Sequence, residues 1–406
     1  METDFDVVIA GGGLNGPALG LALADAGLRV AVVDAAPARQ RAGDNFDGRA
    51  YALALASVRL LGALDLWDGL NGDAQPIRKV QTHQSHGEAA GPFGLFFDSA
   101  EIEEPVLGQM LEDRFLYRAL LEAMQDRLTH IPATKVIGQT VQPGHIEAQL
   151  SDGRVLRARL LVGADGRASQ VAARAGIGRT GHGYAQTALV AAIALERPHE
   201  GTAWQVFLPT GPLGVLPLRG DRASVVWSVK GPQAQAIADL SDDDFIAALS
   251  PHLIDVTGKI ELCGPRFGYP LNLTLANDYI AERVALIGDA AHGVHPIAGQ
   301  GLNLGLRDVA ALAECIIDAA RRGEDIGFAT VLTRYQGWRR FDATALGLGM
   351  DAVNTLFSND NPVLRLAREA GMGAVSAIGP LRRRFMRQAA GLTLDPMPRL
   401  LAGKPL

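Results

Sequence analysis

The sequence predicts an α/β fold in which one chain forms a parallel sheet with its helices, an interleaved second β-sheet and a helical C-terminal region. Three patterns support this prediction. An apolar run at residues 5–10 passes through glycines into a helical pattern, and the same order of strand, turn and helix recurs at residues 157–177 and 283–314. Between these last two segments, runs rich in β-branched and aromatic residues alternate with turns, which is typical of a sheet.

The composition is that of an ordinary soluble globular protein. The 406 residues suit one large domain or two closely packed ones, and the net charge of −6 argues against broad attraction to nucleic acid. Cys263 and Cys315 cannot form a disulfide framework and lack metal-ligand spacing. The N-terminus lacks the basic start of a secretion signal, and no apolar run reaches the roughly 18 residues of a membrane-spanning helix. We therefore expect a cytoplasmic protein.

The first segment carries a dinucleotide-binding fingerprint. Its apolar run FDVVIA is typical of a parallel strand covered on both faces. Gly11, Gly13 and Gly16 follow at G-x-G-x-x-G spacing, and Asp34 closes the next strand about twenty residues on. Glycines let the backbone approach a pyrophosphate at the helix N-terminus, while the acid accepts hydrogen bonds from ribose hydroxyls. The alternative is a glycine-rich turn without a ligand, which the acid and its context disfavour.

The later two segments repeat this order of strand, turn and helix, but they differ in how strongly they indicate a ligand site. The ADG turn at residues 164–166 is weak evidence alone, because Asp-Gly turns are common in loops. The strand VALIG is followed by a loop with Asp289, His292 and Pro296, and residues 300–303 then open a long helix. This second glycine-rich helix entrance lies almost three hundred residues from the first.

Two such entrances predict one long cofactor that reaches both. An FAD whose adenosine lies at the first turn places its isoalloxazine ring far away, whereas NAD has no distant ring to hold. A helix N-terminus there would favour the negative charge of the reduced ring by about 0.3 to 1 kcal/mol when exposed, and up to about 2 kcal/mol when partly buried. A glycine-rich loop that leads into a packing helix is the alternative.

His292 and His295 invite a metal interpretation, which we reject. No carboxylate or cysteine lies at ligand spacing, and the residues between them form a glycine-rich loop rather than one helix face. We therefore expect no metal. Each histidine is expected either to be satisfied within the protein or to bond the cofactor.

Four strings together resemble the class A flavoprotein monooxygenases: GGGLNG with Asp34, GADG at 163–166, GDAAH at 288–292 and HPIAGQGLNLGLRD at 295–308. The last string is most similar to the ubiquinone-biosynthesis hydroxylase family, and the resemblance covers nearly the whole chain. It implies a Rossmann-like FAD-binding domain of the glutathione-reductase type with an interleaved substrate domain. The implied segments are residues 1–72, 107–177 and 278–330 for FAD binding, 73–106 and 178–277 for the substrate domain, and 331–406 for the C-terminal helical region.

The resemblance also implies the residues of the site. Pro296, Gly299 and Gln300 would form the catalytic loop at the flavin ring, and it assigns no general base. The implied cofactor-binding residues are Gly11, Gly13, Gly16, Asp34, Arg49, Gln109, Arg114, Asp165, Gly166, Gly288, Asp289, Pro296, Gly299, Gln300, Gly301, Leu302 and Asn303.

The chemistry implied by the resemblance is hydroxylation of a polyprenylated phenol in ubiquinone biosynthesis. Reduced FAD would capture O₂ as a C4a-hydroperoxide and transfer its distal oxygen to the ring, while the protein excludes water. NAD(P)H is the expected transient electron donor, because the sequence holds one full dinucleotide fingerprint. The substrate candidates, for which plain core packing is the alternative, are Phe207, Leu216, Pro217, Trp227 and Tyr269.

The segment LRRRFMRQ at residues 381–388 clusters arginines in a helical stretch. A solvated basic helix face is the interpretation that we prefer. The alternative is contact with an anionic membrane surface or with partners in a ubiquinone-biosynthesis complex. The protein would then be peripheral to the inner membrane face.

Three other functions stay open on the sequence alone. An NAD-binding dehydrogenase would be colourless, and a bound yellow cofactor would exclude it. A related hydroxylase of a small soluble phenol would act on water-soluble phenols and ignore prenylated ones. A flavin-binding scaffold of a biosynthetic complex would keep its role in a variant such as Asp289→Ala.

Overall fold

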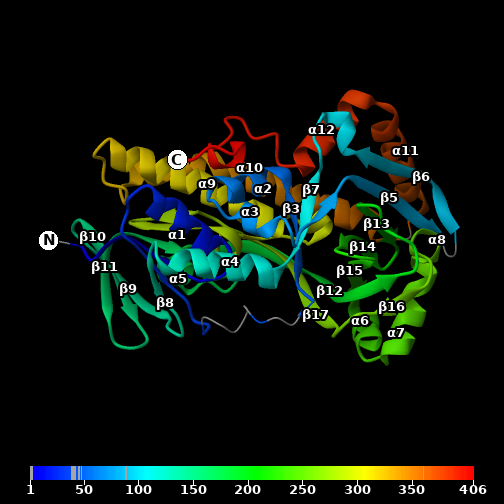
Figure 1. The fold of residues 1–406 in the computed structure, drawn as a ribbon, viewed down its shortest axis with the longest axis horizontal. Coiled ribbons are helices and arrows are strands. Elements are labelled where there is room, and N and C mark those ends of the chain that lie inside the picture. Colours follow the sequence, from blue (N-terminus) through cyan, green and yellow to red (C-terminus); the bar gives the residue numbers. More distant parts are fainter. Residues whose placement is uncertain (1–2, 38–42, 44–45, 47, 87–88, 360) are drawn as a thin grey trace.

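The computed structural model describes residues 3–37, 43, 46, 48–86, 89–359 and 361–406, which form three sheets with flanking helices (Figure 1). The first is the expected parallel sheet, with central strands in the order β19-β11-β1-β2-β8. Its strands are β1 (Phe5–Ala10), β2 (Val30–Val33), β8 (Thr129–Ile131), β9 (Val136–Gln142), β10 (His145–Leu150), β11 (Val155–Gly163), β18 (Ile280–Ala281) and β19 (Val284–Leu286).

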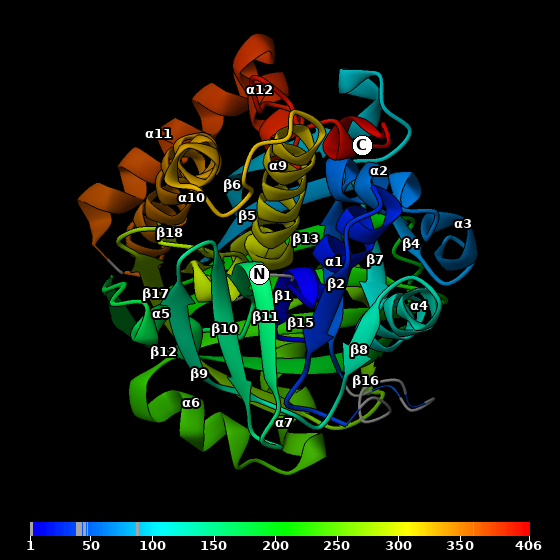
Figure 2. The same ribbon diagram turned by 90° about the vertical axis from the view of Figure 1, so that its left-hand side faces the viewer.

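Helices from both ends of the chain pack together beside this sheet. The long α9 contacts α1 and α10, and α4 contacts α1 and β8 (Figure 2). Residues 16–23 of α1 are all buried, so this helix is apolar on every side and belongs to the core. The helices are α1 (Asn15–Asp25), α4 (Asp113–Gln125), α5 (Gln170–Arg174), α9 (Gln300–Arg321) and α10 (Ala329–Phe357), with the short η3 (Gly288–Ala290), η4 (Ile297–Gly299) and η5 (Leu400–Ala402).

The second sheet is mostly antiparallel and runs in the order β20-β17-β12-β15-β14-β13-β5-β6, with β16 beside β12. One of its faces packs on α6 and α7 to form a core separate from that of the first sheet. The strands are β5 (Lys79–His86), β6 (Ala89–Asp98), β12 (Arg179–Leu195), β13 (Thr202–Leu208), β14 (Gly211–Leu218), β15 (Arg222–Lys230), β16 (Ile260–Leu262), β17 (Phe267–Ala276) and β20 (His292–Gly293). The helices are α6 (Gly231–Ala238), α7 (Asp242–Leu249), η2 (Ser250–His252) and α8 (Ile254–Thr257).

A small third sheet, β3-β7-β4, lies where the two larger units meet. β3 contacts α9 and η4, whereas β4 and β7 contact β14 of the second sheet. It joins segments from both expected domains, and β20 likewise adds part of the expected FAD-binding segment 278–330 to the second sheet. Its strands are β3 (Ala50–Ala54), β4 (Gln75–Ile77) and β7 (Gly108–Glu112), next to α2 (Leu55–Ala63) and α3 (Trp67–Leu70).

The expected helical C-terminal region is confirmed. After α10, helix α11 (Pro362–Ala377) packs on β6, and α12 (Gly379–Ala389) packs on η1 (Ser99–Ile102). These helices therefore lie over the second sheet, far along the molecule from the parallel one (Figure 1). In the described part of the chain, every helix is too short or too polar to cross a membrane.

A buried ionic network joins α9, α10 and the turn after β19. The carboxylate of Asp308 accepts hydrogen bonds from the Gly288 N–H at 3.0 Å, from His292 Nε2 at 2.6 Å and from Arg339 Nε at 2.8 Å. The side chains of Asp308 and Arg339 are fully buried. Burial opposes the charge of Asp308, but His292 and Arg339 outweigh it and lower the pKa of the carboxyl.

Replacing Asp308 should therefore destabilise the fold strongly. Asp308→Asn removes the charge that faces the buried Arg339, and breaking a buried ion pair costs about 3–5 kcal/mol. Because the folded-state pKa of Asp308 is lowered, its contribution is present above the ordinary carboxyl pKa and is lost as pH falls through the folded value. Thermal unfolding followed by circular dichroism should give Asp308→Asn a lower Tm than wild type at neutral pH. The difference in Tm between the two proteins should be smaller in acid. The surface pair Asp152 and Arg154 supplies the control, since Asp152→Asn should leave Tm unchanged.

Candidate active site

The three loops that the sequence singles out converge at the carboxyl ends of the parallel strands. The first contact joins the turn after β1 to the turn after β11. Gly11 has φ +122°, and a Cβ atom at this position would lie 2.2 Å from the carbonyl oxygen of Ala164. The Ala164 N–H also donates to the Ala10 carbonyl at 2.8 Å. Only glycine allows this approach, so the two turns form one surface.

Asn15 joins the first turn to the third loop. A Cβ atom on Gly288 or on Gly305 would lie 2.4 or 2.2 Å, respectively, from Asn15 Nδ2, so the side chain lies tightly between the turn after β19 and α9. The second and third loops meet through an ion pair in which Arg167 Nε donates to Asp289 Oδ2 at 3.1 Å. All three loops are therefore held together by direct contacts.

The first turn has the geometry of a nucleotide cradle. The carboxylate of Asp34 is buried at the end of β2, and a Cβ atom on Gly12 would lie 2.4 Å from its Oδ2 atom. A Cβ atom on Gly13, by contrast, would meet open space. The acid thus lies against the glycine turn, with room beside Gly13 for a phosphate group at the start of α1, and these residues fit the adenosine half of FAD.

The N-terminus of α9 fits the other half of the cofactor. Gly299 is the N-cap residue with φ +63° and makes no side-chain capping bond, and the first turn contains no acid. Its partial positive charge is therefore available to a ligand. Asn303 fixes this end: its Oδ1 accepts from the Ala54 N–H and the Ser57 hydroxyl at 2.8 Å each, and its Nδ2 donates to the Ala52 carbonyl at 2.8 Å.

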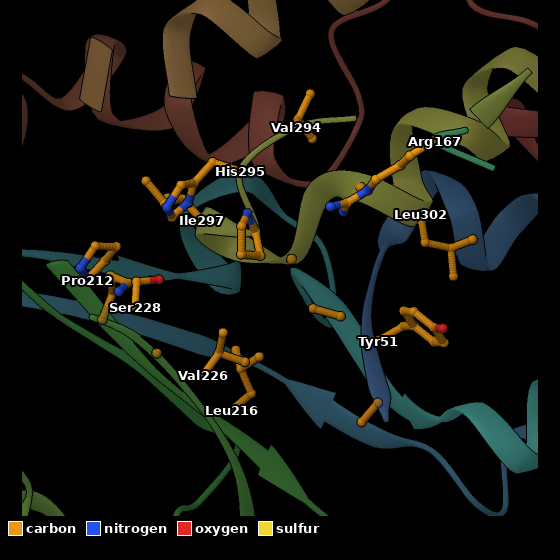
Figure 3. Close-up of a pocket in the computed structure, with 17 residues that line it drawn as sticks. Tyr51, Arg167, Pro212, Leu216, Val226, Ser228, Val294, His295, Ile297 and Leu302 are labelled. Atoms are coloured by element: carbon orange, nitrogen blue, oxygen red, sulfur yellow. The ribbon is translucent and has the colours of Figure 1, made fainter. Parts of the chain in front are cut away.

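A cavity of about 220 Å³ lies between this helix entrance and the second sheet (Figure 3). The loop residues His295 and Ile297 lie on one side of it, and the strand residues Pro212, Val226 and Ser228 lie on the other. It is lined by Ala50, Tyr51, Ala52, Arg167, Gln205, Pro212, Gly214, Leu216, Val226, Ser228, Val294, His295, Pro296, Ile297, Gly299, Gly301 and Leu302. A cavity beside a helix N-terminus suits the ring of a flavin.

A second cavity of about 210 Å³ lies next to the first and is almost entirely apolar. The two share Ala52, Gln205, Leu216 and Ile297 as a common wall. Met386 and Ala389 of α12 also line the second cavity. Its other lining residues are Leu53, Ala54, Ile77, Val80, Thr82, Phe97, Leu107, Gly108, Ala203, Trp204, Phe207 and Gln300.

Several expected cofactor residues bond to the protein instead of lining either cavity. Arg49 pairs with Asp113 at 3.5 Å, and Arg114 Nε donates to Glu112 at 2.8 Å. Asp165 caps α5 by accepting from the Gln170 N–H at 2.8 Å. Gln109 is buried in β7, and its Oε1 accepts no hydrogen bond from the described residues. Cofactor contacts of these side chains, and of Asn303, stay predictions.

The substrate candidates divide between the two faces of the second sheet. Phe207 lines the apolar cavity and Leu216 lines both cavities. Trp227 instead packs against Phe245 in the core under α7, because strand residues alternate between faces. Pro217 lies one position from Leu216 and is absent from both linings, while Tyr269 is exposed and stacks on Phe267.

Sequence reasoning missed the polar and small residues of the cavity wall. Val226 and Ser228 alternate with the predicted Trp227 along β15, so the period-two pattern would have found them once the face was known. Gln205 on β13 carried no motif, and Asn15 occupies one of the variable positions of the G-x-G-x-x-G fingerprint. Arg167, two residues after Asp165, could have been found as the cation nearest the ADG turn.

The two histidines of the motif have different surroundings. His292 bonds Asp308 in the buried network. His295 lines the first cavity, and neither of its ring nitrogens bonds to a described residue. Burial lowers the pKa of His295 to about 4, against a small opposing effect of Asp351, so its imidazole is neutral at physiological pH.

Comparisons with known proteins agree with this geometry. A family model described as "FAD binding domain" matches residues 4–340. Ubiquinone hydroxylase UbiL of Rhodospirillum rubrum is 44% identical over 99% of this chain and 93% of its own length. 3-Demethoxyubiquinol 3-hydroxylase of Escherichia coli is 36% identical over 95% of this chain and 98% of its own. The fold is similar to that of p-nitrophenol 4-monooxygenase PnpA from Pseudomonas putida, with TM-score 0.78 at 21% identity over 97% of this chain and 99% of that one.

The fold and the match place the chain among the FAD-binding flavoprotein monooxygenases of class A. Within this class, it belongs to the group that contains the ubiquinone-biosynthesis hydroxylases. FAD is therefore confirmed as the cofactor that the two glycine-rich entrances predict.

Filling the nucleotide cradle should remove the cofactor without unfolding the protein. Gly13→Val places a branched side chain in the open space where the pyrophosphate would lie, and no atom of the described residues lies within 4 Å of the new Cβ atom. The purified variant should keep the wild-type circular dichroism spectrum but lose its flavin absorbance. Gly337→Val in α10 also points into open space and should stay yellow. A yellow Gly13→Val protein would contradict the assignment of the cradle.

Proposed function

We propose that this protein is an FAD-dependent monooxygenase that hydroxylates the aromatic ring of a polyprenylated phenol in ubiquinone biosynthesis. The observation that carries the proposal is that two unlike cavities lie next to each other. One lies at the N-terminus of α9 and has polar groups from Arg167, Gln205 and His295, and the other is apolar. A phenol ring with an isoprenoid tail has the same two-part chemistry.

The residues of the first cavity would hold the reacting groups. Bound FAD, once reduced, would activate O₂, and one of the two oxygen atoms of O₂ would enter the ring. Pro296, Gly299 and Gly301 would lie against the flavin, and the helix N-terminus would stabilise negative charge on it. Pro212, Leu216 and Val226 would face the phenol from the strand side and exclude water. Two cavities of about this size leave room for the ring and the first isoprene units.

NAD(P)H is the proposed electron donor. The one dinucleotide fingerprint of the sequence is assigned to FAD, so the nicotinamide nucleotide would bind only transiently. Reduction of the bound flavin by NADH and by NADPH under anaerobic conditions would identify the donor. If neither reduces it, a protein donor is required.

The function is tested by product analysis with purified holoenzyme. Chemically reduced enzyme is mixed with isotopically labelled O₂ and either 2-prenylphenol or unsubstituted phenol. Mass spectrometry should find one labelled oxygen atom in the prenylated product and little in the other. The reverse preference would identify a hydroxylase of soluble phenols. Labelled product from neither phenol would leave the scaffold function.

Narrowing the apolar cavity should weaken binding of the isoprenoid tail of the substrate and leave binding of the phenol ring unchanged. Ala389 lies at the cavity wall and is exposed on α12, so Ala389→Phe can reduce the opening without disturbing the core. We expect KM for the prenylated phenol to rise several-fold, with little change for a phenol without a tail. Ala236→Phe on the exposed side of α6 is the matched control and should change neither. Equal effects on both phenols would contradict a tail site here.

We also propose peripheral contact with a membrane through α12, the alternative that the arginine cluster left open. Met386 of this helix faces the apolar cavity, while Arg383, Arg384 and Arg387 are exposed. Phe385 is 49% exposed among these arginines, and Ile378 just before the helix is 50% exposed. Basic groups beside exposed apolar side chains favour an anionic lipid surface. Arg382 does not contribute, because it pairs with Glu101 at 2.6 Å.

Removing the exposed charges should weaken this contact. Replacing Arg383, Arg384 and Arg387 together by glutamine should lower binding to vesicles that contain anionic lipid on the order of a hundredfold at low salt. Binding is measured by co-sedimentation, and wild-type binding should fall as salt rises. A triple glutamine variant at the exposed Arg154, Arg157 and Arg219 tests for a general charge effect and should bind like the wild type. Equal loss in both variants would contradict the assignment to α12.

A further inference from the structure

Gln205 lies in the middle of β13, where its side chain lines both cavities. The other six residues of this strand are buried, whereas Gln205 is partly exposed. Its side-chain amide hydrogen-bonds to none of the described residues. The N–H donors and the carbonyl acceptor of this amide are therefore available to a ligand that enters either cavity.

The pairing of the strands sets the surroundings of Gln205. On β14 it lies opposite Gly214, and Gly214 lies opposite Val226 on β15. A Cβ atom on Gly214 would lie 3.6 Å from Gln205 Oε1 and 3.9 Å from the Val226 carbonyl oxygen. Because glycine has no side chain, the amide of Gln205 has space beside β14 on the side of the first cavity.

The two cavities follow each other across the strands of the second sheet. β15 lines the first cavity through Val226 and Ser228, whereas β5 lines the apolar cavity through Val80 and Thr82. β14 and β13 lie between these two strands, and Gln205 on β13 lines both cavities. Figure 3 shows the β15 residues on the strand side of the first cavity. A ligand with its head in one cavity and its tail in the other therefore meets Gln205 where head and tail join.

Gln205 is the polar member of the wall that the two cavities share. The other residues of this wall are Ala52, Leu216 and Ile297. The polar side chains that line the first cavity and not the apolar one are Tyr51, Arg167, Ser228 and His295. A ring oxygen far from the tail would meet this second set, whereas an oxygen on the ring carbon next to the tail would meet Gln205.

We propose that the amide of Gln205 hydrogen-bonds the substrate hydroxyl that is ortho to the isoprenoid tail and thereby determines which ring carbon is hydroxylated. This proposal rests on the proposed hydroxylase function. The amide can accept the proton of the hydroxyl group or donate to its oxygen. It does not ionise, so neither a proton nor an electron is transferred in this contact. Gln205 acts by orienting the ring.

The orientation matters because a ring held by its tail can turn about the bond that joins the two. Half a turn exchanges the carbon ortho to the hydroxyl with the carbon para to it, and both carbons are electron-rich in a phenol. One of the two orientations places the hydroxyl at Gln205. A hydrogen bond there would favour this orientation by about tenfold, so one carbon would lie at the flavin.

Product analysis tests the orientation. Chemically reduced holoenzyme is mixed with O₂ and 2-prenylphenol, and chromatography separates the catechol from the hydroquinone, which carry the new oxygen ortho and para to the first. Wild type should give one product in about tenfold excess. Gln205→Met has a side chain of similar length without the amide and should give comparable amounts of both. Gln205→Glu keeps an oxygen that accepts the phenolic proton and should keep the excess. A mixture from wild type, or a Gln205→Met variant as selective as wild type, would overturn the proposal.

Ligand binding tests the contact without turnover. Flavin fluorescence measures the affinity of oxidised holoenzyme for 2-prenylphenol and for 2-prenyltoluene, in which a methyl group replaces the hydroxyl. The ratio of these affinities should fall about tenfold in Gln205→Met. The ratio for 3-prenylphenol and 3-prenyltoluene, whose substituents lie one ring carbon further from the tail, should be the same in wild type and variant. An unchanged first ratio, or an equal fall in both ratios, would contradict a contact with the ortho hydroxyl.

The controls separate this proposal from the function on which it rests. Gln233→Met changes an exposed glutamine on α6 and should behave as wild type in both measurements. Equal changes in Gln233→Met and Gln205→Met would overturn the assignment to Gln205. If wild type hydroxylates no phenol, the proposed function fails, and the two affinity ratios still decide whether Gln205 binds the ortho hydroxyl.

Discussion

The buried carboxylate of Asp308 is the interaction on which the site depends. It lies in the first half of α9, yet it bonds the Gly288 amide and His292 of the preceding loop and Arg339 of α10. A charge with no exposure requires such partners, because an uncompensated one would be too costly to bury. The loop that carries Asp289 and the N-terminus of α9 are therefore fixed in position relative to each other. Through Arg339, α10 is held by the same network.

Local patterns predicted the nucleotide-binding half well. Strand β1 has the bounds expected from its apolar run, and Gly11 and Asp34 lie against neighbouring loops as a fingerprint requires. Such features depend on residues close together in sequence. Asn15 carries no motif of its own, although it lies tightly between α9 and the turn after β19, because its importance comes only from contacts across the fold.

The substrate half could not be predicted to the same depth. Whether Val226 or Trp227 faces the cavity depends on the pairing of β15 with β12 and β14, which no local pattern determines. The same limit applies to the motif histidines. His292 and His295 are three positions apart in similar sequence, and only the fold gives one a carboxylate partner and leaves the other facing the cavity.

The shared wall between the two cavities has an evolutionary consequence. Its four residues, Ala52, Gln205, Leu216 and Ile297, come from four separate elements, and beyond it the apolar cavity is built largely from β3, β5, β13 and α12. Few of these residues touch the nucleotide-binding loops. After gene duplication, substitutions in the apolar cavity alone could change which apolar group one copy prefers. The FAD-binding loops would stay unchanged.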